Sequence, residues 1–407
     1  MKRGTFILLG MTVCLMQSAG AAEPPPAQSS GWRGDGSGRF PEANPPIEWN
    51  GDTGKNILWK TKVGLGKFSS PTLVNGKIFV VSEPARLICM DADSGKILWE
   101  KPNDFAELPG KVEPKPLPEG HENTTPTPVS DGQFVYAAFG TGIVACYDLQ
   151  GQRQWIRHVE APAGLQYGRS CSPVLLGGKL IVGVHFTFAL DAKTGQVLWK
   201  NEDVAEGYGT PLAARIGGVE MVITPSGKVV RLSDGKILAV TTELPYASPI
   251  IRDDTAYFIG PVSSAISLAK SAVDPAVRTL WKTDLEGTFF ASPILHAGLL
   301  YTCSNEGVLL VLNAADGKIV ATREIEIGSA GGRPGVANAN IYPSLVLAGK
   351  YLFLSNDIGE TLVLEPGREF RQIRRNDLGD GFSGAPVFAG KRMYVRAKER
   401  LYCIEAP

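Results

Sequence analysis

The sequence predicts an all-β chain folded as an eight-bladed β-propeller of four-stranded antiparallel blades, with the ring closed by an N-terminal strand. The chain has 407 residues, of which 47 are Gly and 29 are Pro, and these residues do not cluster into low-complexity blocks. They mark a repeated phrase in which a short loop ends at a Pro and an apolar strand follows. The phrase recurs at Ser70-Pro71, Thr127-Pro128, Ser172-Pro173, Thr210-Pro211, Ser248-Pro249, Ser292-Pro293, Tyr342-Pro343 and Ala385-Pro386. The first and last of these prolines are 315 residues apart, a mean period of 45, which is the length of one propeller blade.

The strands of one repeat can be identified from turns and alternation. In the first repeat we expect strands at 71–74, 77–81, 87–90 and 97–99. Asn75-Gly76 supplies the two-residue turn between the first two, because Asn and Gly tolerate the positive φ that such a turn needs. The last strand is preceded by a longer turn that ends in Gly95.

A tryptophan recurs on the fourth, outermost strand of most repeats. It occurs as Trp59, Trp99, Trp155, Trp199 and Trp281. A residue in that place can lie across the gap to the next blade, so its recurrence predicts packing and not five ligand sites. Ala239 and Ala321 take the position in two repeats, where we expect different packing.

The two ends of the chain close the ring. The last repeat, from Ala385 to Glu405, lacks an outermost strand, and the residues before the first repeat, 57–60, resemble an isolated one. We therefore expect a signal peptide at 1–22, a linker and strap at 23–55, and an eight-bladed propeller at 56–407.

The N-terminus has the three regions of a secretory signal. Lys2 and Arg3 precede an apolar run, 6–16, that is too short to span a bilayer, and small residues follow it. The pattern predicts cleavage after Ala21 or Ala22. The mature chain is expected to be periplasmic or secreted, monomeric and without a transmembrane segment.

Charge and cysteine content exclude further classes. With 41 basic and 41 acidic residues, the chain has no excess cation to neutralise the phosphates of a nucleic acid. The cysteines form no CxxC, no haem-attachment motif and no adjacent pair. Cys89, Cys146 and Cys403 occupy similar apolar phrases in different repeats, too far apart to bridge, so we expect small buried thiols.

The repeat resembles that of a known family. The phrase from Leu190 to Trp199, Leu-Asp-Ala-Lys-Thr-Gly-Gln-Val-Leu-Trp, is similar to the repeat of PQQ-like propellers. These include the quinoprotein alcohol dehydrogenases and the outer-membrane assembly factor BamB. The stretches 31–36, 127–132 and 139–142 resemble secreted bacterial proteins with PQQ-like repeats. The Trp-Asp and Gly-His signals of WD40 propellers do not recur in this sequence.

The resemblance implies a cofactor site that this sequence does not reproduce. Quinoprotein dehydrogenases hold PQQ against a disulfide between adjacent cysteines, bind Ca²⁺ through carboxylate and amide oxygens, and use an Asp as base. This chain has no adjacent cysteines, and none of its Asp residues can be assigned that role by motif. No catalytic residue, metal ligand or cofactor is therefore assigned, and PQQ with Ca²⁺ is kept as the alternative.

Polar and aromatic residues converge on one face of the predicted ring. The segments that lead from the outermost strand of one blade to the innermost strand of the next share that face with the turns between second and third strands. The candidate ligand-binding residues there are His121, Glu122, Asn123, Tyr167, Arg169, His185, Tyr208, Tyr246, Asn305, Asn340, Tyr342 and Asp357. Such a mixture is typical of a binding funnel.

Several candidates have a structural alternative. His121 with Glu122 could form a metal or acid–base pair or a solvated loop, and Arg169 could bind a ligand carboxylate or inner-strand carbonyls. His185 is expected to pack beside Phe186 against a neighbouring blade. The Asn and Asp residues at 305 and 357 are natural turn formers, which favours a turn over a Ca²⁺ site.

Two functional hypotheses follow. The first is an exported, non-catalytic scaffold that binds an envelope protein or a small ligand at the funnel mouth. The alternative is a PQQ-dependent or sugar-binding oxidoreductase with a degenerate cofactor site, which the repeat resemblance and the aromatic, Asn-rich mouth would suit.

Overall fold

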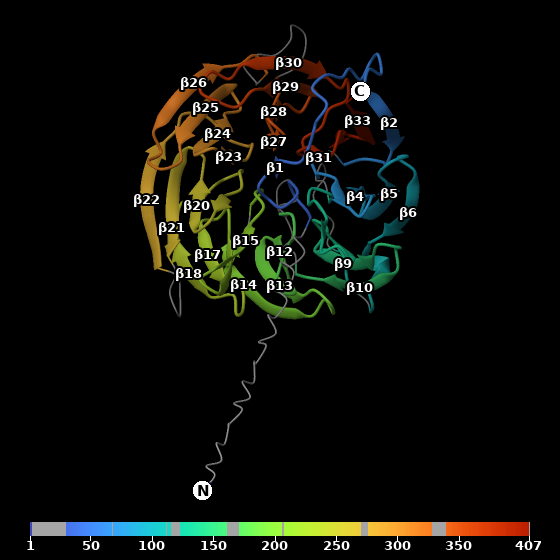
Figure 1. Ribbon diagram of the computed structural model, residues 1–407. Coiled ribbons are helices and arrows are strands. Elements are labelled where there is room, and N and C mark those ends of the chain that lie inside the picture. Colours follow the sequence, from blue (N-terminus) through green and yellow to red (C-terminus); the bar gives the residue numbers. More distant parts are fainter. Residues whose placement is uncertain are drawn as a thin grey trace.

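The computed structural model is a closed ring of eight antiparallel β-sheets that radiate from a central channel (Figure 1). It describes residue 1 and residues 30–66, 68–110, 112–114, 123–160, 171–205, 207–269, 276–327 and 339–406. Seven sheets have four strands and one has five. The predicted eight-bladed propeller is thus confirmed, and the predicted signal peptide lies outside the described residues apart from residue 1.

The strands of each blade follow one another from the channel outward. Blades one to four consist of β3 (Thr72–Val74), β4 (Lys77–Ser82), β5 (Arg86–Asp91), β6 (Ile97–Pro102); β7 (Val129–Ser130), β8 (Phe134–Ala138), β9 (Ile143–Asp148), β10 (Arg153–His158); β11 (Val174–Leu176), β12 (Lys179–Val184), β13 (Phe186–Asp191), β14 (Val197–Ala205); and β15 (Leu212–Ile216), β16 (Val219–Ile223), β17 (Lys228–Arg231), β18 (Ile237–Val240). A single turn of 3₁₀ helix, η1 (Phe105–Glu107), follows the first blade.

The second half of the ring repeats this order, with two additions. Blades five to eight consist of β19 (Ile250–Arg252), β20 (Thr255–Phe258), β21 (Val262–Ala269), β22 (Ala276–Asp284); β23 (Ile294–His296), β24 (Leu299–Cys303), β25 (Val308–Asn313), β26 (Ile319–Glu324); β27 (Val346–Ala348), β28 (Tyr351–Ser355), β29 (Glu360–Leu364), β30 (Gln372–Asp377); and β31 (Val387–Ala389), β32 (Arg392–Arg396), β33 (Arg400–Glu405). The additions are β1 (Arg39–Phe40), inside blade seven, and β2 (Ile57–Lys62), outside blade eight.

The ring closes as the sequence predicts. Strand β2 pairs antiparallel with β33, with Trp59 opposite Cys403, and supplies the missing outermost strand of blade eight. The last three strands of the chain therefore pair with a strand from its N-terminal part. No free edge is left at the seam between blades eight and one.

The core lies between neighbouring blades. The middle strands, such as β5, have all their inner residues buried, because each sheet packs with both faces against other sheets. One cluster joins Phe79 and Cys89 of blade one to Val135 and Tyr147 of blade two. The outermost strand β2 alternates instead, with half-buried and exposed residues following each other one by one.

The recurring tryptophans bridge adjacent blades, as predicted. The indole of Trp155 in blade two donates to the carbonyl of Ala192 in blade three at 3.0 Å. A Cβ on Gly195 of the same turn would lie 2.6 Å from the Trp155 ring. The same pairing of an indole with a turn glycine joins Trp59 to Gly95, Trp99 to Gly151, Trp199 to Gly235 and Trp281 to Gly317. The turn glycine is therefore needed both for its positive φ and to make room for the ring.

The junctions without this tryptophan are filled in other ways. Next to blade six, whose outermost strand carries Ala321, the cluster contains Phe370, which makes an edge contact with Tyr301. Next to blade seven, Trp49 of the N-terminal segment is buried and stacks on Phe353.

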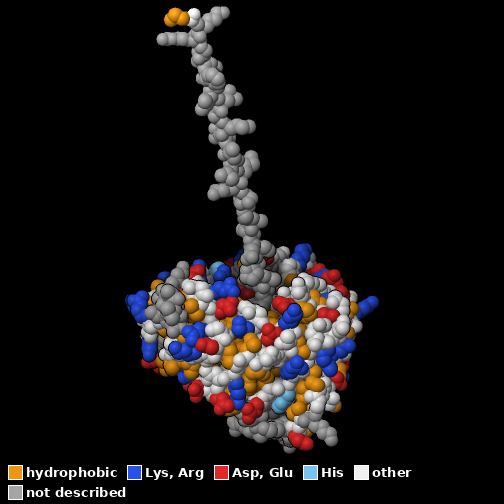
Figure 2. All heavy atoms as spheres, turned by 90° about the horizontal axis from the view of Figure 1, so that it is seen from below, with side chains coloured by type: hydrophobic (Ala, Val, Ile, Leu, Met, Phe, Trp, Pro, Cys, Tyr) orange, Lys and Arg blue, Asp and Glu red, His pale blue; other side chains and the backbone are white. Residues whose placement is uncertain are grey.

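The surface of the ring carries both signs of charge. On the side seen in Figure 2, basic and acidic side chains alternate with small apolar areas. No helix in the described part of the chain is long and apolar enough to cross a bilayer.

Candidate functional site

Four predicted mouth residues, His121, Glu122, Tyr167 and Arg169, lie outside the described residues, so their placement stays a prediction. The other eight lie, as expected, in the segments that enter innermost strands or in the turns between second and third strands.

The most extended feature of this face is a row of five aromatic rings, which we call the aromatic arc. It consists of Tyr208, Tyr246, Phe290, Tyr342 and Phe68. The distances between successive ring centroids are 5.7, 4.7, 4.9 and 6.0 Å, all within the range of favourable aromatic contacts. Tyr208 and Tyr246 are each 38 % exposed, whereas the other three rings are half-buried.

The repeat register explains why these rings meet. Each lies two residues before the residue that opens the innermost segment of its blade, here called the anchor. The anchors of the arc are Thr210, Ser248, Ser292, Ser344 and Ser70. Equivalent positions of consecutive blades are neighbours at the channel, so the rings of blades four to seven form a chain. Blade eight has the small Ser383 at this position, and the ring of blade seven there meets Phe68 of blade one.

The anchors form a second layer beneath the arc. The backbone N–H of one anchor donates to the side-chain hydroxyl of the next, from Ser70 to Thr127 at 2.8 Å and from Thr127 to Ser172 at 3.0 Å. The series continues from Thr210 to Ser248, Ser292 and Ser344 at 2.7, 2.9 and 3.1 Å. In blade seven the hydroxyl comes from Ser344, which directly follows the Tyr342-Pro343 phrase from which the repeat was identified. The ring of hydroxyls is interrupted in blade eight, where the anchor is Ala385.

Three predicted polar residues, Asn305, Asn340 and Asp357, come together at blades six and seven. The Asp357 carboxylate accepts the backbone N–H of Asn340 at 2.8 Å, and the side-chain Oδ1 of Asn305 accepts the backbone N–H of Ile341 at 2.9 Å. The amide of Asn305 also donates to that of Asn340 at 3.2 Å. These contacts hold the segment that enters blade seven, which matches the turn-forming alternative.

Asn123 contributes to the mouth through its backbone. Its N–H and that of Thr124 donate to one carboxylate oxygen of Glu83 at 2.7 and 3.0 Å, and the Thr124 hydroxyl donates to the same oxygen at 2.7 Å. Glu83 lies in a turn between second and third strands and was not among the predicted residues.

The carboxylate of Glu306 also accepts a backbone N–H group, that of Thr288. Burial raises the pKa of Glu306, but hydrogen bonds from its own backbone, Ser304 and Thr288 outweigh burial and hold that pKa below its usual value.

His185 forms a one-residue turn between β12 and β13. Its φ is +66°, in the left-handed region, and its ring makes an edge contact with Phe186 at 4.7 Å. This contact is with the next residue of the chain, and the packing of His185 against a neighbouring blade stays a prediction.

The N-terminal strap enters the channel from the opposite face. Strand β1 runs parallel to β27 with Arg39 beside Leu347, and Arg33 reaches further along the same strand to the carbonyl of Leu345. Figure 1 shows this segment as the blue loop in the middle of the ring. Because innermost strands start at the mouth, Arg33 lies on the mouth side of β1. No sequence pattern predicts this role, because a single Arg in a Gly-rich segment is not distinctive.

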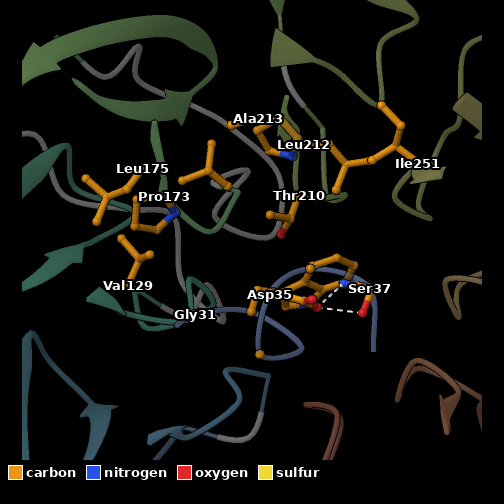
Figure 3. Close-up of a pocket in the computed structure, with 15 residues that line it drawn as sticks. Gly31, Asp35, Ser37, Val129, Pro173, Leu175, Thr210, Leu212, Ala213 and Ile251 are labelled. Atoms are coloured by element: carbon orange, nitrogen blue, oxygen red, sulfur yellow. Dashed lines mark hydrogen bonds between the residues drawn. The ribbon is translucent and has the colours of Figure 1, made fainter. Parts of the chain in front are cut away.

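The strap does not fill the channel completely. Its contacts run to blades one, two, six, seven and eight, and a cavity of about 190 Å³ remains beside blades three to five. Figure 3 shows this gap between Asp35 and Ser37 of the strap and Thr210, Leu212 and Ile251 on the inner strands. Its lining is mostly apolar, with the Thr210 anchor at one side.

The described part of the chain has buried cysteines but no group of metal ligands. It contains no cluster of three or more His, Cys, Asp or Glu side chains placed to hold a metal ion. Cys89, Cys146, Cys171, Cys303 and Cys403 are all free and buried, as predicted. Burial raises the pKa of the Cys89, Cys146 and Cys403 thiols to about 12, so these groups are not nucleophiles at neutral pH.

Comparisons with known proteins point to one group. A family model described as "Outer membrane protein assembly factor BamB" matches residues 45–183. The BamB proteins of Yersinia pestis and Moranella endobia are each 23 % identical to this chain, over 68 % and 62 % of it and over 71 % and 64 % of their own lengths. The serine/threonine-protein kinase AfsK of Streptomyces griseus is 24 % identical over 66 % of this chain but only 32 % of its own length.

Solved structures agree on the fold. The BamB structure from Moraxella catarrhalis superposes with a TM-score of 0.61 at 12 % identity, covering 86 % of this chain and 99 % of that one. The Saccharomyces cerevisiae Sqt1 structure gives 0.61 at 11 % identity, covering 86 % and 99 %. At such low identity these structures support the fold alone. The repeat, the family model and the relatives together show that the chain is a BamB-like β-propeller built of PQQ-like repeats.

Proposed function

We propose that this chain is an exported, non-catalytic scaffold that binds a protein of the bacterial envelope on the aromatic arc. The arc is the observation that carries the proposal. Tyrosine is enriched among residues that dominate protein interfaces, because it presents a large rigid surface with a polar tip. Two of the five rings expose more than a third of their surface, and they are neighbours in contact at 5.7 Å.

The surroundings of the arc support binding by shape more than by charge. The carboxylates of Glu83 and Asp357 on this face are engaged by backbone N–H groups. The chain has equal numbers of basic and acidic residues. The relatives named as outer membrane protein assembly factors also support a protein-binding role, since assembly requires contact with another protein. The predicted signal peptide would deliver the chain to the bacterial envelope.

The test is site-specific photocrosslinking in the envelope of the native host. A photoreactive residue replaces Tyr246 in one protein and Val240, which is 67 % exposed on the outermost strand of blade four, in the control. We expect one discrete adduct from position 246 that is absent at 240 and is lost when Tyr208→Ala is added. Equal labelling at both positions, or no adduct at 246, would overturn the proposal.

The oxidoreductase alternative is distinguished by titration with PQQ and Ca²⁺. The arc offers ring faces on which a planar cofactor would stack, which is the feature that favours this alternative. A scaffold gives no saturable thermal shift. A saturable shift that Tyr246→Ala abolishes would favour the cofactor-binding alternative.

A further inference from the structure

The described part of the central channel contains several buried N–H and O–H groups that donate no hydrogen bond. The hydroxyls of Thr127, Ser172, Ser248 and Ser292 each accept one backbone N–H and donate to no other described residue. All four side chains are at most 4 % exposed. The Ser70 hydroxyl is buried without any partner. Each of these groups carries an O–H that needs an acceptor.

Arg33 adds a cation just beneath this ring of hydroxyls. Its Nη2 donates to the carbonyls of Pro293 and Leu345 at 2.9 and 2.7 Å, and these residues directly follow the anchors Ser292 and Ser344. The Arg33 side chain is 0 % exposed, and its Nε and Nη1 have no hydrogen-bond partner among the described residues. Three N–H bonds of a buried guanidinium are therefore unused.

No carboxylate in the described part of the chain pairs with Arg33. The nearest acidic side chain along the strap, Asp35, is exposed and accepts the N–H and hydroxyl of Ser37 instead. Burial lowers the pKa of Arg33 to about 9, and attraction to Asp35 offsets only part of that effect. An unpaired buried cation is costly, so a counter-charge in the channel would be stabilising.

The guanidinium is held in a fixed position. A Cβ on Gly38 would lie 2.2 Å from Nη2 and 2.5 Å from Nε, so the returning strap packs directly on the group. The Trp32 ring lies 5.1 Å from its central carbon. By contrast, Arg396, the other fully buried arginine in this part of the chain, directs its Nη atoms to the carbonyls of Ala397, Gly64 and Val81. Both terminal nitrogens of Arg396 therefore donate to backbone carbonyls, whereas only one terminal nitrogen of Arg33 does so.

We propose that the central channel is an anion-binding site, in which a phosphate or carboxylate group lies between the Arg33 guanidinium and the anchor hydroxyls. Guanidinium groups bind both kinds of oxyanion through paired N–H bonds, and hydroxyl donors complete the shell. The cavity beside the strap, about 190 Å³ in volume, is lined by Trp32 and Gly34, the chain neighbours of Arg33, and by the Thr210 anchor. The site is independent of the aromatic arc, so either can fail without the other.

The experiment measures thermal unfolding of the full mature chain in titrations with sodium phosphate, acetate and chloride at equal ionic strength. We expect a saturable rise of Tm with phosphate or acetate that exceeds the effect of chloride, because a ligand of the native state stabilises it in proportion to its occupancy. The stronger of the two arms identifies the class of anion.

Variants locate the binding site. Arg33→Gln is expected to weaken the apparent affinity about tenfold or more, and Ser344→Ala about fivefold, since each removes donors of known strength. Arg374→Gln, which removes an exposed arginine, should leave the titration unchanged. If Arg33→Gln does not fold, the titrations of wild type and Ser344→Ala still test the proposal. Identical, non-saturating shifts of Tm with all three salts in wild type would overturn the proposal. The donors in the channel would then bind water.

Discussion

The outer and inner rings of this propeller are built by different rules. On the outside, one device repeats: a tryptophan of one blade covers the turn glycine of the next, with the indole N–H on a turn carbonyl in four of the five cases. On the inside, the anchor position is Ser, Thr or Ala, and the position two residues earlier varies from Tyr and Phe to Ser and Thr.

The difference separates stability from binding. Most of the outer contacts are closed within the protein, because four of the five indole N–H groups donate to the turn that they cover. The N–H of Trp59 has no partner among the described residues. The inner groups are incompletely engaged, with exposed tyrosine surface at the mouth and unused donors in the channel. Substitutions in the outer ring should therefore lower the free energy of unfolding, whereas those in the inner ring should mainly change binding.

The largest expected effect is at an outer tryptophan. Trp155→Ala removes a side chain that is 5 % exposed and leaves a cavity between blades two and three, at an expected loss of about 3–5 kcal/mol in the free energy of unfolding. Tyr246→Ala, at the mouth and 38 % exposed, should lose about 1 kcal/mol. Urea unfolding of both variants tests this. Equal losses would remove the distinction between the rings.

The next effect separates packing from backbone conformation. Gly195 and Gly178, both in blade three, have φ of +69° and +72°. A Cβ would collide with the Trp155 ring at Gly195 but meets nothing within 4 Å at Gly178. Gly178→Ala should therefore show only the cost of the left-handed conformation, about 1 kcal/mol. Gly195→Ala should lose about 1–3 kcal/mol more by overpacking, again measured by urea unfolding. Similar losses in the two variants would mean that the indole of Trp155 moves aside without a cost in stability.

The smallest effect is electrostatic and lies in an outer turn of blade four. The bidentate hydrogen bond from Arg231 holds the pKa of Asp234 at about 2, below its value in the unfolded chain. The resulting stability is present above the unfolded pKa and is lost as the pH falls from about 4 to about 2. Because the carboxylate is half exposed, we expect less than about 1 kcal/mol.

Comparison with Asp234→Asn isolates this contribution. Wild type and variant should differ in free energy of unfolding at pH 5 and converge near pH 2. Asp253→Asn, at an exposed carboxylate 3.9 Å from the nearest arginine nitrogen, is the control. A difference that persists undiminished at low pH would contradict the assignment to ionisation.

Some residues of the site could be found from the sequence and others could not. Tyr208, Tyr246 and Tyr342 were predicted because they lie in the segments that lead into the innermost strands. Phe68 was missed, although it holds the same position in blade one. The hydrogen-bonded cluster of Asn305 and its neighbours could be predicted only as turn formers, since which carboxylate meets which N–H depends on how two loops approach each other.

What the sequence alone determined is the architecture. The period, the turn glycines and the recurring tryptophans are local patterns that each blade repeats, so they specify eight blades and the strand that closes the ring. The tertiary structure alone decided the chemistry of the channel. Arg33 is separated by 260 and 312 residues from the carbonyls it contacts, and the five rings of the arc come from five blades. Such groups meet only because closing the ring brings every inner strand to one axis, which no local pattern records.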